Sequence, residues 1–176
     1  MNLHDRPLPR RAPARIRVER LGPKIDDGRH PAKRTVGEDV VIGADVLRDG
    51  HEVLHAVVRW REPDATRWSE APMVHVDADR AGVRWEGSVP LDRPGRWRFT
   101  VRAWADPLAS WRDELSRKVA GGQADLDSEL AEGAALLADA AVRSMRSDRA
   151  LLRSAASRVA DTGLPIADRI GAATDP

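Results

Sequence analysis

The chain contains 176 residues, 41% of them hydrophobic and 32% charged, which is the composition of a globular protein. This length excludes a complete (β/α)₈ enzyme barrel, which needs about 250 residues, and the absence of Cys excludes disulfides, thiol nucleophiles and Cys-based zinc sites from these residues. Because 29 Lys and Arg nearly balance 28 Asp and Glu, the net charge indicates no particular partner.

The first 36 residues are basic, with ten Lys and Arg against four Asp and Glu, and residues 1–14 are expected to form a flexible arm. The arm lacks the interleaved aromatic residues of a single-strand binder and any helical recognition pattern, so we expect no nucleic acid partner. No apolar run approaches the roughly 20 residues of a membrane helix, and no export signal is recognisable. We therefore expect a cytoplasmic protein with no membrane contact.

Residues 15–105 have the pattern of short β-strands, predicted at 16–21, 40–46, 53–61, 68–76, 83–89 and 96–104. In the second of these segments, every other residue is apolar, which places Val40, Ile42, Ala44 and Val46 on one face of an extended strand. In the segment 53–61, the same alternation predicts that Ala56, Val58 and Trp60 face the core.

The segment 96–104 has the clearest alternation of the chain. Its apolar face carries Trp97, Phe99, Val101 and Ala103, and its other face is cationic. Turn sequences that end in Gly, at 49–50 and 94–95, separate strands of this kind. About seven short strands at this spacing predict an antiparallel β-sandwich of immunoglobulin or fibronectin type over residues 15–105.

Residues 106–170 have the pattern of helices, and we expect a tail at 171–176. Asp106 followed by Pro107 is a helix start, and the first helix is expected to end at the two glycines 121–122. Further helices are predicted from Asp127 to about Met145 and from Asp148 to Asp161. The fold class is therefore α+β, with the sandwich followed by an α-helical hairpin or bundle segment.

The predicted helices carry apolar stripes that two or three helices cannot cover among themselves. Leu108, Trp111, Leu115 and Val119 form the first stripe. Leu130, Ala134, Leu137, Ala141 and Met145 form the second, and the third contains Leu151, Leu152, Ala155, Ala156 and Val159. We expect these stripes to pack on the sandwich or on a second copy, and therefore predict a homodimer through the helices and the sandwich.

No catalytic, metal or cofactor site can be assembled from the residues that could carry one. His51 and His55 are four apart but lie in a predicted strand, so they do not converge on a metal. The acidic residues that could form a glycosidase pair lie in predicted turns, where Asp has a structural use: Asp26, Asp27, Asp77, Asp79 and Asp92. Ser69, Ser88 and Ser110 have no nucleophile motif, and no phosphate-binding glycine loop occurs.

Six Trp fall between residues 60 and 111, and an exposed Trp on a sandwich can stack on a sugar ring. Trp68, Trp104 and Trp111 are the candidates for such contact with an α-glucan. Because Trp in a strand more often belongs to the core, the carbohydrate-binding module remains the alternative function.

Three segments resemble the start of the bacterial α-1,4-glucan:maltose-1-phosphate maltosyltransferases of the amylase family. They are DDGRHPAKRTVGE at 26–38, VLRDGHE at 46–52 and WADPLASWRDEL at 104–115. The resemblance extends from Arg15 to about Ala160, and it includes residues 123–132, which are similar to the first long helix of the family's helical insert.

The resemblance implies a β-sandwich and a helical insert that precede a catalytic barrel and take part in dimer formation. It also implies transfer of maltosyl units from maltose-1-phosphate to α-glucan by an aspartate nucleophile and a glutamate acid/base in that barrel. None of the barrel's motifs occurs in these residues, so no catalytic residue is carried over. We expect the N-terminal assembly region of such an enzyme, inactive by itself, encoded as a truncated gene, a fragment or one part of a split enzyme.

Overall fold

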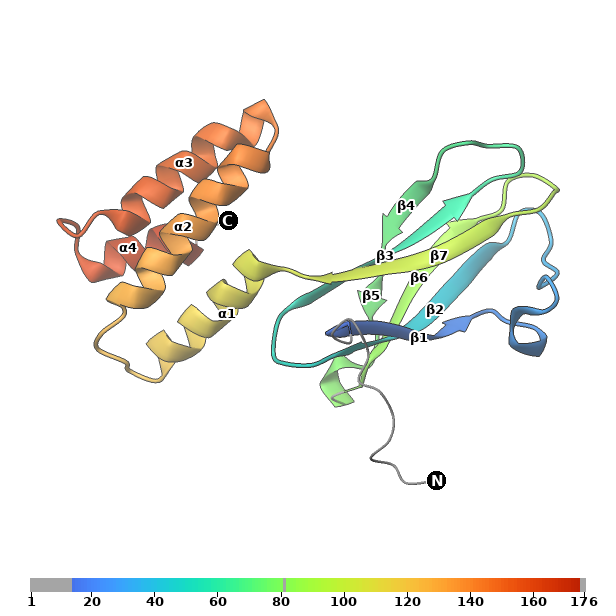
Figure 1. Cartoon of the computed structure of the whole chain (residues 1–176), viewed down its shortest axis with the longest axis horizontal. Coiled ribbons are helices and arrows are strands. Elements are labelled where there is room, and N and C mark those ends of the chain that lie inside the picture. Colours follow the sequence, from blue (N-terminus) through green and yellow to red (C-terminus); the bar gives the residue numbers. More distant parts are fainter. Residues whose placement is uncertain (1–13, 81, 175–176) are drawn as a thin grey trace, which may run out of the picture. The chain divides into compact units, whose positions relative to one another are not determined.

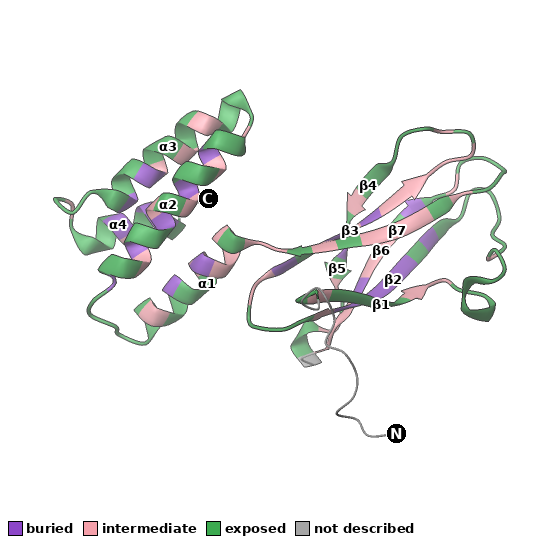
Figure 2. Ribbon diagram, viewed as in Figure 1, coloured by how far each residue is buried: buried purple, intermediate pink, exposed green. Residues whose placement is uncertain are grey.

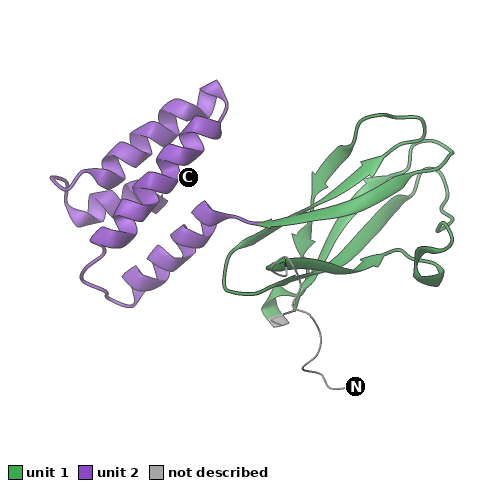
Figure 3. Ribbon diagram, viewed as in Figure 1, with its two compact units in different colours: residues 1–104 green, residues 105–176 purple. Residues whose placement is uncertain are grey.

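The computed structural model describes residues 14–80 and 82–174 and divides the chain into two units. Unit 1 contains residues 1–104 and unit 2 contains residues 105–176 (Figure 3). The basic arm expected over residues 1–14 lies, except for Ala14, outside the described residues.

Unit 1 contains two antiparallel sheets, which confirms the predicted sandwich (Figure 1). The first sheet has the strand order β1-β2-β6-β5, formed by β1 (Ile16–Gly22), β2 (Asp39–Arg48), β6 (Arg84–Pro90) and β5 (Val74–His75). The second has the order β4-β3-β7, formed by β4 (Ser69–Pro72), β3 (Leu54–Arg61) and β7 (Arg98–Ala105). Short 3-10 helices, η2 (Asp26–Gly28) and η3 (Ala78–Arg80), lie in connecting segments.

The apolar alternation of the sequence becomes the core of the sandwich. Val40, Ile42, Ala44 and Val46 of β2 are all buried, as predicted, and Figure 2 shows this strand as the most buried of unit 1. In β3, Ala56 and Val58 are buried, whereas the predicted third core residue, Trp60, is only half-buried. The apolar face of β7 is also only half-buried, while Arg98 and Arg102 on its other face are exposed.

The predicted strand at 68–76 is two strands that belong to different sheets. β4 pairs with β3, where Glu70 lies opposite Arg59, and β5 pairs with β6, where His75 lies opposite Trp85. Between β4 and β5, the side chain of Met73 is buried in the core. The chain therefore passes from one sheet to the other within a few residues.

Unit 2 contains, among its described residues, the helices α1 (Pro107–Ala120), α2 (Asp127–Arg143), α3 (Arg146–Ala160) and α4 (Ile166–Thr174). The predicted start of α1 is confirmed, because Asp106 accepts a hydrogen bond from the backbone N–H of Ala109 at 2.9 Å and Pro107 is the first helical residue. The core is formed by side chains from all four helices, with fully buried residues at Leu115, Leu130, Leu137, Val159 and Ala173.

Two sequence-based expectations for unit 2 differ from the structure. Residues 171–174, expected to belong to a tail, form the end of α4, because Ala172 and Ala173 are buried in the helical core. Met145, expected at the end of a core stripe, lies between α2 and α3 and is 77% exposed, and Leu151 on α3 is 74% exposed.

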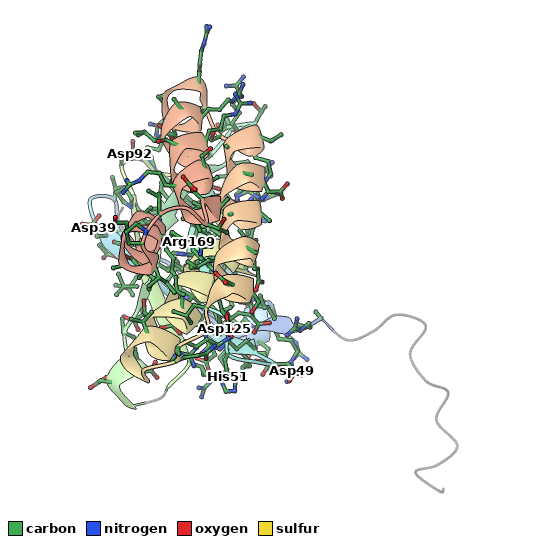
Figure 4. The ribbon with its side chains drawn as sticks, turned by 90° about the vertical axis from the view of Figure 1, so that its left-hand side faces the viewer. Asp39, Asp49, His51, Asp92, Asp125 and Arg169 are labelled. Carbon is green, nitrogen blue, oxygen red and sulfur yellow. The ribbon has the colours of Figure 1, made fainter. Side chains whose placement is uncertain are left out.

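Two arginines hold α4 against the other helices. Arg169 is buried, donates from Nε to the backbone oxygen of Val159 at 3.0 Å, and donates from Nη1 to Asp127 at 2.8 Å. Figure 4 labels Arg169 among the helices of unit 2. Arg112 of α1 donates from Nε to the backbone oxygen of Ala173 at 2.9 Å. These bonds connect α4 to α1, α2 and α3.

Candidate functional site

Two of the three candidate tryptophans are accessible. Trp68 and Trp104 of unit 1 are each 37% exposed, so part of each ring can be reached from solvent. Trp111 is 5% exposed, and its Nε1 donates to the backbone oxygen of Glu129 at 2.7 Å. The expectation that Trp111 is available to a sugar is therefore wrong, because this ring fills the core between α1 and α2.

The accessible tryptophans are already in contact with cations and with an imidazole. The guanidinium groups of Arg59 and Arg61 lie 5.6 and 5.4 Å from the ring centre of Trp68. Arg102 lies 5.2 Å from the ring centre of Trp104, and the ring of His55 stacks on it at 6.0 Å. A sugar ring that stacks on either Trp would have to displace such a contact or use the remaining face.

In the described part of the chain, histidines and acidic residues come together in pairs, as His75 and Asp77 do. Among the described residues, no group of three metal-binding side chains occurs. Figure 4 shows Asp39 and Asp92 in one part of the molecule and Asp49 and His51 in another. This separation follows from the register, because Asp39 lies opposite Pro90 at the start of β2, while Asp49 follows the last residue of the same strand.

Three further candidates have structural contacts. Asp77 accepts a hydrogen bond from the backbone N–H of Arg84 at 2.8 Å and lies 3.4 Å from the imidazole of His75. The guanidinium of Arg93 donates two hydrogen bonds to Asp92 and lowers the pKa of that carboxyl. The hydroxyl of Ser110 donates to the backbone oxygen of Asp106 at 2.6 Å, in the first turn of α1.

Unit 1 has a cavity of about 420 Å³ at the end of β3, which the sequence pattern does not predict. Its lining consists of Arg61, residues 62–66 of the β3–β4 loop, Arg96 in the turn before β7, and Arg98, the first residue of β7. The cationic face of β7 is visible in the sequence, but its approach to a loop more than 30 positions earlier is a property of the fold.

An ion pair of unit 2 joins α1 to α2. Lys118 donates to Glu129 at 2.6 Å and lies 2.7 Å from Glu114, and these two carboxylates raise its pKa. The hydrogen bond from Lys118, with further hydrogen bonds from the backbone and Ser128, lowers the pKa of Glu129 to about 2. This ion pair lies beside the Trp111 hydrogen bond, so it stabilises the packing of α1 on α2.

Unit 2 also exposes large apolar side chains near the turn between α2 and α3. Val142, Met145 and Leu151 are 70%, 77% and 74% exposed. The first belongs to the last turn of α2 and the third to the first half of α3, and these two helices pack against each other. We call these three residues the α2–α3 apolar cluster. Separately, none of the helices in the described part of the chain is both long and apolar enough to cross a membrane.

A comparison with known protein families matches residues 14–176, which include both units. The family is described as "Alpha-1,4-glucan:maltose-1-phosphate maltosyltransferase, domain N/S". The chain belongs to this family. The resemblance carried by the three segments at 26–38, 46–52 and 104–115 is thereby confirmed.

Individual maltosyltransferases agree with this assignment. The enzyme of Myxococcus xanthus is 48% identical over 130 residues, which is 72% of this chain and 19% of that enzyme. The enzyme of Burkholderia pseudomallei is 40% identical over 78% of this chain and 12% of its own length. Maltosyltransferase 2 of Streptomyces coelicolor is 36% identical over 92% of this chain and 24% of its own length. The chain therefore spans between about an eighth and a quarter of these relatives.

Proposed function

We propose that this chain is the N-terminal assembly region of a maltosyltransferase that extends α-1,4-glucan from maltose-1-phosphate, and that residues 1–176 do not include the catalytic barrel. The observation that carries the proposal is the family match over residues 14–176, which runs through the sandwich and the helices alike. The region would act in the cytoplasm, in keeping with a chain that has no Cys. By itself it is expected not to release phosphate from maltose-1-phosphate.

The assembly role would be dimer formation through the helices, with a contribution from the sandwich. The α2–α3 apolar cluster supports it, because three large side chains are more than two-thirds exposed on one pair of helices. Burying such side chains against a second copy gains about 25 cal/mol for each Å² of apolar surface removed from water.

Light scattering on a size-exclusion column tests the dimer. The chain has a mass of 19.4 kDa, and we expect the measured mass to rise towards twice that value as concentration increases from about 1 to 100 μM. Leu151→Glu places a charge in the cluster and should hold the mass at that of one chain. Ala167→Glu, at an exposed position of α4, adds the same charge elsewhere and should behave as the unsubstituted chain.

A mass of 19.4 kDa throughout this range, with helical circular dichroism intact, contradicts the assembly role. The role is also contradicted if the chain forms a dimer and Leu151→Glu, like Ala167→Glu, leaves its mass unchanged. The α2–α3 apolar cluster would then not be the dimer interface.

A second candidate function is direct contact with α-glucan through the sandwich. The partial exposure of Trp68 and Trp104 favours it, whereas the arginines already placed at both rings oppose it. Calorimetry with maltooligosaccharides distinguishes the two functions. Binding that Trp104→Ala abolishes supports the glucan contact, and the absence of heat and of Trp fluorescence change at millimolar sugar removes it.

A further inference from the structure

Two loops of unit 1 meet at the cavity described above. The turn before β7 contains Gly95, which has φ of +137° and lies so close to Pro63 that an added Cβ would fall 2.5 Å from the proline Cγ. In the same turn, Trp97 Nε1 donates to the backbone oxygen of Arg93 at 3.1 Å. The close packing of the two loops therefore fixes where the backbone of Arg96 lies relative to the β3–β4 loop.

The cavity arginines differ from the other arginines of this sheet in having no carboxylate partner. Arg59 and Arg102 share Glu70, at 3.4 and 3.6 Å. By contrast, none of the three cavity arginines forms an ion pair with a carboxylate among the residues that the structure describes: Arg61, Arg96 and Arg98. The guanidinium of Arg61 lies instead over the ring of Trp68. Three arginines without an ion-pair partner among the described residues therefore line one cavity.

Two carboxylates also line the cavity, so its three arginines exceed its acidic residues by one charge. Glu62 lies 3.4 Å from Arg93, a fourth guanidinium, which also binds Asp92. Asp64 is exposed at the turn of the loop, with φ of +61°. The lining contains no aromatic ring, so its chemistry suits a charged ligand rather than an apolar one.

We propose that this cavity binds a phosphate group. Guanidinium donors form a planar fork that matches two phosphate oxygens, and three of them can contact a dianion from several sides. A volume of about 420 Å³ lies within the usual range of ligand pockets, about 300 to 1,000 Å³, and exceeds what one phosphate ion needs. The phosphate can therefore come from free inorganic phosphate or from a phosphorylated sugar. The sugar-phosphate source rests on the proposed function, and the inorganic source does not.

The test titrates the full chain with inorganic phosphate, maltose-1-phosphate and maltose, at constant ionic strength set by chloride. Calorimetry gives the dissociation constant, and ¹⁵N–¹H spectra locate the binding. We expect millimolar or tighter binding of phosphate, with shifts in the backbone amides of Glu62 and residues 64–66, and no binding of maltose here. The double variant Arg96→Gln/Arg98→Gln should weaken phosphate binding by about tenfold or more, because each lost guanidinium removes a charge-assisted hydrogen bond.

The matched control is Arg146→Gln/Arg153→Gln on α3, which removes two exposed arginines from the other unit and should change the phosphate affinity less than twofold. Equal binding of phosphate and maltose-1-phosphate supports a site for the phosphate alone, and tighter binding of maltose-1-phosphate supports one that also recognises sugar.

The proposal is overturned if the folded chain shows neither heat nor shifts at Glu62 and residues 64–66 in about 20 mM phosphate. It is also overturned if both double variants lose affinity equally, since binding would then follow net charge. The spectra of the unsubstituted chain decide the question even if a variant fails to fold. Because the phosphate titration does not depend on oligomeric state, failure of the dimer proposal is read separately.

Discussion

Replacing Gly133 by Ala should destabilise unit 2, although Ala is the better helix former. Gly133 lies within α2 and is buried, and a Cβ at this position would collide with the Cζ2, Cε2 and Cη2 atoms of the Trp111 indole. Removing Gly from a helix gains about 1 kcal/mol, but overpacking costs about 1 to 3 kcal/mol. Moving the ring away costs more, because loss of a buried Trp side chain costs about 3 to 5 kcal/mol.

The ring cannot shift without loss, since its Nε1 donates to Glu129 at 2.7 Å. Breaking this hydrogen bond adds about 1 kcal/mol. The net loss expected for Gly133→Ala is therefore about 2 kcal/mol. For a unit of this size, that loss lowers the melting temperature by about 8 to 16 °C.

Gly171→Ala is the matched control, because it is the same substitution in a helix without the obstruction. Gly171 is exposed in α4, and nothing lies within 4 Å of a Cβ built there. The helix propensity should then act alone and stabilise unit 2 by up to about 1 kcal/mol. The two Gly→Ala variants are expected to change stability in opposite directions.

The assay is urea unfolding of the full chain, followed by circular dichroism at 222 nm, where the helices dominate the signal. If Gly133→Ala stabilises the chain as Gly171→Ala does, the packing of Trp111 over α2 described above is incorrect. A decrease in stability for both variants would instead indicate that helix propensity does not control this unit.

Three further substitutions test other contacts. Arg169→Leu should lower the free energy of unfolding of unit 2 by about 2 kcal/mol and increase amide exchange in residues 166–174, because it removes two hydrogen bonds of a buried guanidinium. The control Arg158→Leu, at an exposed position of α3, should lower it by less than about 0.5 kcal/mol. The folded pKa of Glu129 is about 2, below its ordinary value of 4.5, so its carboxylate stabilises unit 2 above pH 4.5 and this contribution is lost as pH falls from 4.5 towards 2. Glu129→Gln should therefore flatten the acid unfolding profile between these pH values. An unchanged profile would argue against the Lys118 contact. Asp45→Asn should lower the stability of the sandwich by about 1 to 3 kcal/mol, because this buried carboxylate forms ion pairs with Arg20 and Arg84. Unfolding followed by Trp fluorescence measures this loss, and an unchanged midpoint would show that the ion pairs are solvated.

The sandwich could be predicted where one face of a strand is apolar and the other polar. In β2, the period of two places Val40, Ile42, Ala44 and Val46 in the core, because alternate side chains of a strand point to opposite faces. The break at Met73 could not be predicted, since its backbone N–H donates to the oxygen of Ala56 at 2.9 Å while the chain changes sheets. That change depends on which strands are neighbours, and no local pattern contains this information.

The fourth helix shows the same limit for unit 2. Apart from Ile166 and Ile170, its apolar residues are alanines, and the pattern lacks the Leu-rich stripe of α2. Arg169 looks like a surface residue in the sequence, but acceptors on α2 and α3 allow it to be buried. The burial of a charged side chain follows from the arrangement of its partners, which the sequence does not show.

The candidate site was predicted only in part. The exposure of Trp68 and Trp104 agrees with the sequence-based candidates, and Trp111 fell on a helical stripe with Leu115 that correctly indicates core. The cavity arginines were visible only as a cationic face. Arg61 and Arg96 line one cavity because Pro63 packs on Gly95, and contacts of this kind between loops leave no periodic signal.

The presence of α4 changes the physical basis of the dimer proposal. Two or three helices would have left apolar stripes uncovered, but α4 contributes Ala172 and Ala173 to a core that is already closed within one chain. Among the described residues of unit 2, the large apolar side chains most exposed to a second copy are those of the α2–α3 apolar cluster. Two copies related by a two-fold axis would bury six such side chains, each worth about 2 kcal/mol, and association costs about 4 to 15 kcal/mol. A dimer held by this cluster alone is therefore weak, so a tight dimer would require the sandwich to contribute a large part of the interface.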